Sequence, residues 1–376
     1  MGSLTDPHSY VLSRRFLSRR TFGGALAAAF LASVTGCGGE STNPGKTTGT
    51  DPSAAPSGDA TFPRTVEHRY GSTTISAEPK RVVVVGLMEQ DALLALGIAP
   101  IAATEWFGEY PGALWPWARE RLGDAPVPQV LPAADGIQYE KVAALQPDLI
   151  IGIYSALTQK DYDTLSQIAP TAAQPKGNAI HWAASWQEVT LGVGAAVGRP
   201  EQARKLVDDL EAVIAKYVAD NPSFKGKTGL VATPYEGFYV YSAADPRGQL
   251  LKSLGFVMPA GLDEVTGKDF GATISNERTD LLDVDALVWL LDFYEADKKK
   301  VDSSRLYTSL DVSKQHRDIF IAGDRAKAYH GGTSFITVLS LPMVLERLVP
   351  QLAAAVDGNP DTPVPEVTET PTSKGG

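Results

Sequence analysis

The chain has 376 residues, of which 34 are basic and 44 acidic, and its formal net charge is −10. This acidic balance argues against nucleic acid as a partner, because phosphate backbones require a basic footprint. Its single cysteine excludes an intramolecular disulfide, so stability must come from packing. A chain of this length is more consistent with two lobes than with one core.

The first element in chain order is a predicted export signal over residues 1–36. Arg19 and Arg20 precede a short apolar run, 23–30, and small residues then lead to Cys37. Paired arginines indicate the bacterial route that exports folded proteins. Val34-Thr35-Gly36-Cys37 resembles the lipobox of bacterial lipoproteins, which implies lipidation of Cys37 and a membrane-anchored mature chain. A tether of this kind favours a Gram-positive host, which has no outer membrane to retain a free carrier. A structural cysteine behind a disordered tail is the alternative.

Two segments have the composition of disordered chain. Residues 37–61 consist almost entirely of Gly, Ser, Thr, Pro, Ala, Asn and Asp, and residues 354–376 are similarly rich in Pro, Thr and Gly. Such segments cannot bury enough apolar surface to fold. We therefore predict a spacer, a folded region over 62–353, and a disordered tail.

The first predicted lobe, residues 62–198, alternates short apolar strands with helices. This alternation indicates a parallel sheet covered on both faces. The predicted strands are 81–85, 98–102 and 149–153, and the predicted helices 91–96, 139–145 and 164–168.

A single long helix is predicted over 199–222, between the lobes. Pro200 suits the first helical position, and Asn221-Pro222 ends the helix. About 20 residues at 1.5 Å rise give a rod of roughly 30 Å, which is long enough to join two domains.

The second predicted lobe, residues 223–353, repeats the alternation. Its predicted strands are 227–233, 286–291 and 319–321, and its predicted helices 249–254 and 341–352. The expected fold is thus α/β, with two Rossmann-like lobes and mainly parallel sheets joined by one rigid helix.

Three stretches carry a family resemblance, which covers residues 62–353. They are Glu78–Pro100, Tyr139–Ile151 with its Pro147-Asp148-Leu149, and Trp186–Leu210 with Gly198-Arg199-Pro200. In this order they resemble the ABC-transporter binding proteins that carry ferric siderophores, haem and cobalamin. The resemblance implies a monomeric carrier that is not an enzyme, binds its ligand in a cleft between the lobes and needs no cofactor. Iron would enter only within a siderophore complex.

The resemblance also implies two permease-docking carboxylates, one on each lobe. They fall on Glu140 and Glu277 in this sequence. Carboxylate–guanidinium pairs orient docking and speed encounter. Ordinary solvated glutamates near helix N-termini are the alternative.

Loops after the carboxyl ends of strands supply the ligand candidates, because ligands of doubly wound sheets collect there. Aromatic rings offer flat amphipathic surface for a bulky, partly polar ligand, although each ring could instead belong to the core. Arg247 is the basic candidate, and a surface salt bridge is its alternative role. With so few cleft cations, a hydroxamate ligand is favoured over the more anionic catecholates. The predicted ligand-binding residues are Trp106, Tyr154, Trp182, Tyr235, Arg247, Phe293 and Tyr294.

Other functions remain open from the sequence alone. Haem or cobalamin could replace the siderophore, and His181 with His330 could hold zinc or manganese if they met in the cleft. An exported hydrolase would need a scattered site, for which Ser334 beside His330 is the nearest pair. No nucleophile elbow, phosphate loop or His-Glu-x-x-His motif supports an enzyme.

Overall fold

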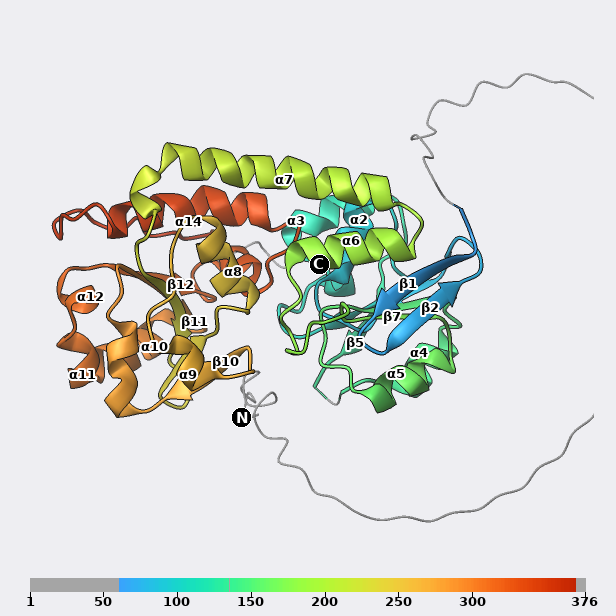
Figure 1. Cartoon of the computed structure of the whole chain (residues 1–376), viewed down its shortest axis with the longest axis horizontal. Coiled ribbons are helices and arrows are strands. Elements are labelled where there is room, and N and C mark those ends of the chain that lie inside the picture. The colour runs from blue at the N-terminus through green and yellow to red at the C-terminus, as the bar shows by residue number, and fades with distance from the viewer. Residues whose placement is uncertain (1–60, 135, 370–376) are drawn as a thin grey trace, which may run out of the picture. The chain divides into compact units, whose positions relative to one another are not determined.

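The computed structural model describes residues 61–134 and 136–369. The predicted signal peptide, Cys37 and nearly all of the predicted spacer lie outside these residues. The described part forms two α/β lobes, so the expected fold class is confirmed (Figure 1). Across that part, none of the helices combines the length and the apolar character that crossing a bilayer requires.

The N-terminal lobe contains a five-stranded parallel sheet of order β5-β4-β3-β6-β7, beside the antiparallel hairpin β1–β2. The strand predicted over 98–102 corresponds to β4, which begins at Ala102 and not at Ile98. Pro100, just before β4, could not donate to a sheet ladder. The strands are β1 (Arg64–His68), β2 (Gly71–Ile75), β3 (Val82–Val84), β4 (Ala102–Glu105), β5 (Gln129–Pro132), β6 (Leu149–Gly152) and β7 (Thr171–Ala173). The helices are α2 (Glu89–Ala95), η1 (Pro111–Ala113), α3 (Pro116–Arg119), η2 (Glu120–Leu122), α4 (Tyr139–Ala144), α5 (Gln159–Ser166) and α6 (Trp186–Ala196).

The C-terminal lobe contains a mixed sheet of order β10-β9-β8-β11-β12, in which β8, β11 and β12 are parallel and β9 and β10 antiparallel. The strands are β8 (Gly229–Thr233), β9 (Phe238–Tyr241), β10 (Gly271–Ile274), β11 (Ala286–Leu291) and β12 (Asp318–Ala322). The helices are η3 (Pro222–Phe224), α8 (Pro246–Ser253), α9 (Leu262–Thr266), η4 (Asn276–Leu282), α10 (Tyr294–Ser303), α11 (Arg305–Thr308), α12 (Asp311–Lys314), α13 (Lys327–Ser334) and α14 (Leu341–Ala355).

Helix α7 (Pro200–Asp220) runs between the lobes and lies along α6 and α14 (Figure 1). Its inward stripe consists of Ala203, Val207, Leu210 and Ile214, at the spacing of one helix face. These side chains belong to one buried apolar cluster that includes residues of both lobes. Burying a large aliphatic side chain contributes about 1.5–3 kcal/mol, so the helix is held along its length by packing.

Part of the predicted disordered tail is ordered in the structure. Residues 357–369, which we call the C-terminal strap, return along α14 and contact it. Val364 and Val367 pack on the main apolar cluster, and the Gln351 amide of α14 donates to the Pro365 carbonyl at 2.6 Å. The expectation of disorder was wrong here because overall composition does not show that a few apolar residues, such as Val364 and Val367, can pack on the surface of a folded lobe.

Candidate functional site

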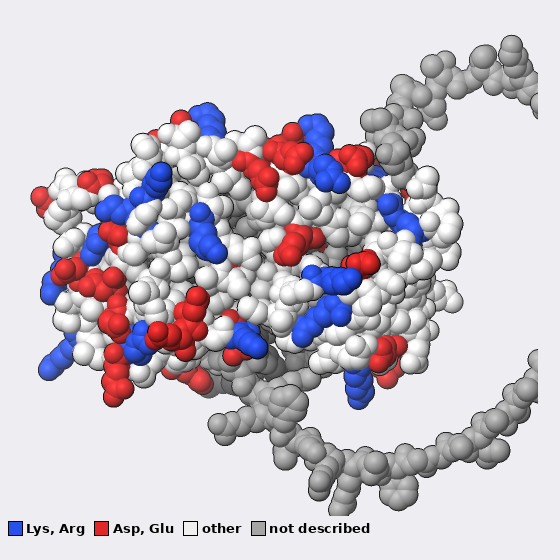
Figure 2. All heavy atoms as spheres, viewed as in Figure 1, with Lys and Arg blue, Asp and Glu red and all other residues white. Residues whose placement is uncertain are grey.

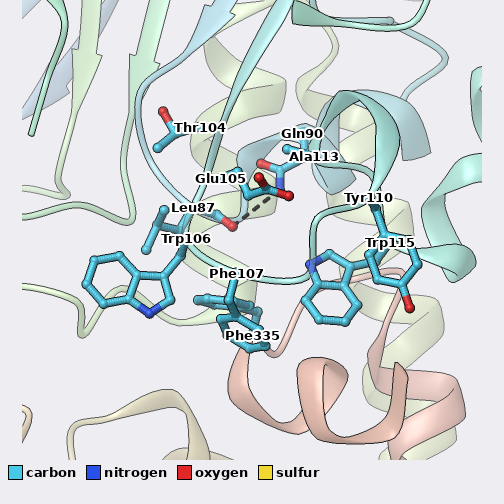
Figure 3. Close-up of a pocket in the computed structure, with 10 residues that line it drawn as sticks. All are labelled: Leu87, Gln90, Thr104, Glu105, Trp106, Phe107, Tyr110, Ala113, Trp115 and Phe335. Carbon is cyan, nitrogen blue, oxygen red and sulfur yellow. Dashed lines mark hydrogen bonds between the residues drawn. The ribbon is translucent and has the colours of Figure 1, made fainter. Parts of the chain in front are cut away.

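A pocket lies at the carboxyl ends of β3 and β4, where the N-terminal lobe meets the C-terminal lobe (Figure 3). The loop after β4 provides most of its wall, the start of α2 provides its polar end, and one residue comes from the C-terminal lobe. The pocket is lined by Leu87, Gln90, Thr104, Glu105, Trp106, Phe107, Tyr110, Ala113, Trp115 and Phe335.

An aromatic cluster centred on Phe107 forms the pocket wall. The Phe107 ring centroid lies 5.3 Å from that of Trp115, 5.2 Å from that of Phe335 and 5.8 Å from that of His330. Phe335 and His330 belong to the C-terminal lobe, so the cluster spans the junction. Aromatic pairs at these separations stabilise by about 0.5–1.5 kcal/mol beyond their buried area. The arrangement provides flat apolar surface for a bulky ligand.

Polar groups at the pocket are few. The Gln90 amide nitrogen donates to the Leu87 carbonyl at 3.3 Å, drawn as a dashed line in Figure 3. Its amide oxygen is buried and has no hydrogen-bond partner in the structure. Burial raises the pKa of Glu105, against the hydrogen bonds from the Glu109 and Tyr110 backbone. A ligand donor could satisfy the Gln90 oxygen, which now bears the cost of an unpaired buried acceptor.

Helix α13 brings the C-terminal lobe against this wall. The Lys327 ammonium lies 4.8 Å from the Tyr110 ring centroid. A Cβ at Gly331 would come within 2.2 Å of the Trp115 ring, so only glycine permits the helix to lie this close.

Besides the ring contacts, two hydrogen bonds connect the lobes. The Thr337 hydroxyl donates to Asp91 Oδ2 at 2.5 Å, and the Gln249 amide donates to the Ala183 carbonyl at 3.1 Å. Asp91 also accepts from Trp117 Nε1 at 2.7 Å. Burial raises the pKa of Asp91 to about 6 in spite of these two donors. The lobes therefore meet through specific contacts of both polar and aromatic kinds.

Arg247, the predicted cleft cation, lies at the start of α8 and is paired within its own lobe. Asp245 is fully buried and accepts from Arg247 Nε at 2.7 Å and from Nη2 at 2.8 Å. Arg247 Nη1 donates to the Ser334 carbonyl at 3.3 Å, and the guanidinium lies 3.8 Å from the Tyr241 ring centroid. Burial would lower the pKa of Arg247, but Asp245 and Tyr241 raise it overall. Its charge is thus compensated by a buried partner, not by a surface salt bridge.

Of the predicted aromatic residues, Trp106 lines the pocket and the others lie elsewhere. Tyr154 is only 3% exposed and packs edge-on against Trp182 at 5.4 Å between ring centroids. Burial raises the pKa of Tyr154, and the nearby Asp245 raises it further. Tyr154 is therefore buried beside a half-buried Trp182, and neither residue lines the pocket.

The remaining predicted aromatics belong to the C-terminal lobe. Tyr235 is half-buried after β8, and Phe293 is 61% exposed after β11. The Arg325 guanidinium lies 3.2 Å from the Tyr294 ring centroid. None of the three lines the pocket.

Glu140 and Glu277, the predicted docking carboxylates, are exposed on separate lobes. Each lies in the first turn of a helix, Glu140 in α4 and Glu277 in η4. Charged side chains of both signs are interspersed over the face shown in Figure 2.

His181 and His330 have separate surroundings. His181 Nδ1 lies 3.5 Å from the Gln174 amide nitrogen, whereas His330 lies beside Phe107. Within residues 61–134 and 136–369, no three His, Cys, Asp or Glu side chains are grouped as metal ligands would be.

Sequence reasoning did not select Phe107, Tyr110, Trp115 and Phe335 as ligand residues. Three of them lie in the aromatic-rich run after β4, so a rule that favoured density of aromatics over single positions could have found them. Phe335 has no local signal, because it reaches the pocket only through the packing of the two lobes.

Comparisons with known proteins agree with this architecture. Residues 82–324 match the model of the family described as periplasmic binding protein. A probable siderophore-binding lipoprotein, YfiY of Bacillus subtilis, is 30% identical over 63% of this chain and 71% of its own. A periplasmic solute binding protein of Mycobacterium smegmatis is 32% identical, with a TM-score of 0.66 over 78% of this chain and 98% of its own.

A third comparison is with a ligand complex. The structure of PiaA from Streptococcus pneumoniae with ferrichrome is 25% identical and has a TM-score of 0.67, over 78% of this chain and 98% of its own. The resemblance found in the sequence is thereby confirmed, as is the expectation that the protein is not an enzyme. The chain belongs to the periplasmic binding protein family, whose members bind substrates for transport.

Proposed function

We propose that this protein captures a ferric siderophore, with a hydroxamate favoured, and delivers it to an ABC permease. The observation that carries the proposal is the aromatic cluster around Phe107, which offers apolar surface where the lobes meet. A siderophore complex is bulky and amphipathic, and an aromatic wall suits such a ligand. The relative from B. subtilis is named for siderophore binding, and the pneumococcal structure holds ferrichrome.

Electrostatics favour a ligand of low charge. A ferric complex of three hydroxamates is neutral, whereas a complex of three catecholates carries three negative charges. The charge of Arg247 is already compensated by Asp245, and Lys327 lies beside the carboxylate-bearing loop that includes Glu105. None of the described residues that line the pocket is Lys or Arg, so a trianion would be desolvated there without matching cations, which costs several kcal/mol.

In this proposal the residues expected from the sequence have different roles toward the ligand. Trp106 contacts the ligand directly, together with the Phe107 cluster. Tyr154, Trp182 and Arg247 support this surface from the buried side of the junction. Tyr235, Phe293 and Tyr294 contact the outer part of a large ligand from the C-terminal lobe.

A panel of ferric hydroxamates, ferric catecholates, ferric citrate, haem and cobalamin tests the ligand class. We expect saturable quenching of tryptophan fluorescence by a ferric hydroxamate, because Trp106 and Trp115 line the pocket. Trp106→Phe should weaken binding about fivefold or more, since buried aromatic contacts dominate binding energy. Trp186→Phe, on α6 away from the pocket, is the matched control and should retain wild-type affinity. Binding of haem or cobalamin in preference to every ferric siderophore would contradict the proposal.

Delivery rests on Glu140 and Glu277, which we propose as the carboxylates that contact permease arginines. They are exposed, lie on different lobes, and each lies in the first turn of a helix. A rigid carrier that presents one charge on each lobe can be recognised in a single orientation.

The export and anchoring of the chain complete the proposal. We place the protein outside the cytoplasm, exported by the twin-arginine route and held to the membrane by lipid on Cys37, in a Gram-positive host. It acts as a monomer. The statements on export and anchoring rest on residues 1–37 and on the curated relative that is called a lipoprotein, and the monomeric state follows from the family resemblance.

Siderophore uptake by cells tests docking and anchoring together. The double variant Glu140→Ala/Glu277→Ala should bind ligand normally but support at least about tenfold less uptake, because two charge-assisted contacts are lost. Glu201→Ala, an exposed glutamate in the first turn of α7, should leave uptake unchanged. Cys37→Ala should move the protein from the membrane fraction to the medium. Full uptake by the double variant would exclude these carboxylates as the docking pair.

A further inference from the structure

Helix α13 begins without a capping side chain of its own. Its N-cap position is Ala326, which makes no side-chain hydrogen bond to the first turn. The first backbone N–H groups of a helix have no intrahelical acceptor, and alanine is among the poorest N-cap residues. The donors of Ala328 and Tyr329 therefore need an acceptor from elsewhere.

Glu369, at the end of the C-terminal strap, supplies that acceptor. Its Oε2 accepts from the Ala328 N–H at 2.8 Å and its Oε1 from the Tyr329 N–H at 3.1 Å. The Arg347 guanidinium of α14 also donates to Oε1. The Glu369 backbone N–H in turn donates to the Arg325 carbonyl at 2.8 Å, just before the helix. A carboxylate from far along the chain thus caps α13.

The strap that carries Glu369 is fixed at several points. Val364 and Val367 pack on the main apolar cluster, and Pro365 accepts from Gln351 of α14. Figure 1 shows the red end of the chain beyond α14, and these contacts place it beside that helix. Contacts from the strap and from α14 fix the position of the Glu369 carboxylate. The carboxylate in turn fixes the first turn of α13.

Residues of α13 also form the C-terminal-lobe wall of the ligand site. Lys327 lies over the Tyr110 ring, and Gly331 packs directly against Trp115. Phe335, which follows the helix, lines the pocket. A shift of the first turn of α13 would therefore move groups that face the pocket.

We propose that Glu369 is a positioning residue for ligand binding, and that the C-terminal strap is a working part of the binding site. The inference rests on the proposed function and deepens it. Glu369 does not touch the ligand. It fixes the first turn of α13 so that the helix meets Tyr110, Trp115 and the pocket in one arrangement, which reduces the ordering that ligand binding must otherwise impose.

The variant Glu369→Gln tests the inference with the full chain. Glutamine places an amide group against one of the two N–H donors and removes the charge that Arg347 contacts. We expect an affinity for the best-binding ferric complex about three- to tenfold weaker, in line with the loss of a helix cap. Amide hydrogen exchange in the first turn of α13 should accelerate by a similar factor, while exchange in α7 stays unchanged.

Two comparisons make the result specific. Glu366→Gln alters an exposed carboxylate of the same strap, 3.7 Å from Arg325, and should leave affinity at the wild-type value. Arg347→Met should weaken binding, and its effect should not add to that of Glu369→Gln because both act on one carboxylate.

The possible outcomes distinguish this inference from the proposed function on which it rests. If wild-type protein binds a ferric complex and Glu369→Gln binds it equally well, the inference is overturned and the proposed function stands. A lower melting temperature with unchanged affinity overturns the inference as well, because it reveals only a structural role. If wild-type protein binds none of the complexes, the proposed function fails and this inference fails with it.

Discussion

Asp245→Ala should lower the free energy of unfolding by about 3–5 kcal/mol at neutral pH, because it leaves the Arg247 guanidinium buried without its counter-charge. Asp245 is fully buried, and Arg247 has no more than a tenth of its side chain exposed. The aspartate accepts two guanidinium hydrogen bonds and one from the Arg247 backbone N–H. Urea denaturation followed by circular dichroism measures the effect.

An exposed ion pair provides the control. Asp280 lies 3.4 Å from Arg278 and is 67% exposed, so Asp280→Ala should cost under about 1 kcal/mol. The double variant Asp245→Ala/Arg247→Met should recover much of the lost stability, because replacing both members of a buried pair with apolar groups is often nearly neutral. A single variant as stable as the wild type would show that the pair is solvated. Siderophore binding by the double variant would then report whether Arg247 acts on the ligand.

The pH dependence of stability should contain a large contribution from Glu89. This glutamate is fully buried at the start of α2, where its carboxylate accepts from the Met88 N–H at 3.0 Å and the Tyr154 N–H at 2.8 Å. Burial raises the pKa of Glu89 from its usual 4.5 to about 7, although these hydrogen bonds oppose the shift. Above its folded pKa the side chain must be buried as an anion.

The direction of this pH dependence follows from the raised pKa of Glu89. Glu89 contributes most to stability below about pH 4.5, and this contribution is lost as the pH rises through about 7. A shift of this size corresponds to about 3 kcal/mol between the two ends of the range. Stability measured between pH 5 and 8 should therefore fall less steeply in Glu89→Gln than in the wild type, although the variant loses one acceptor.

Glu140→Gln is the matched control for this titration, because Glu140 also lies in the first turn of a helix but is exposed. The substitution should leave the free energy of unfolding at pH 7 within about 0.5 kcal/mol of the wild type. Part of the slope should remain in Glu89→Gln, because Asp91, with a pKa of about 6, titrates in the same direction. Identical slopes for wild type and Glu89→Gln would show that Glu89 is ionised throughout the range.

The regular elements could largely be predicted from local patterns. The run Ala286–Leu291 is a buried strand as expected, and α7 begins at Pro200 and ends one residue before Asn221. These predictions succeed because periodicity and end signals are properties of neighbouring residues. The hairpin β1–β2 was not predicted, and its polar strand Gly71–Ile75 shows why: few of its side chains are buried.

The site was only partly predictable. The rule that ligands collect at the carboxyl ends of strands selected Trp106, which lines a pocket, and also Tyr154, which is buried. The rule identifies the edge of the sheet and not the direction in which a side chain points. That direction depends on the partner surface, which in this protein belongs to the other lobe.

The sequence by itself determined the α/β alternation, the joining helix and the family resemblance. Only the tertiary structure decided that Asp91 reaches Thr337 across the lobes and that Glu369 caps α13. The physical reason is distance along the chain. Asp91 and Thr337 are 246 residues apart, and Glu369 and Ala328 are 41 apart. Local propensity does not predict such pairs, because they form only when packing brings their elements together.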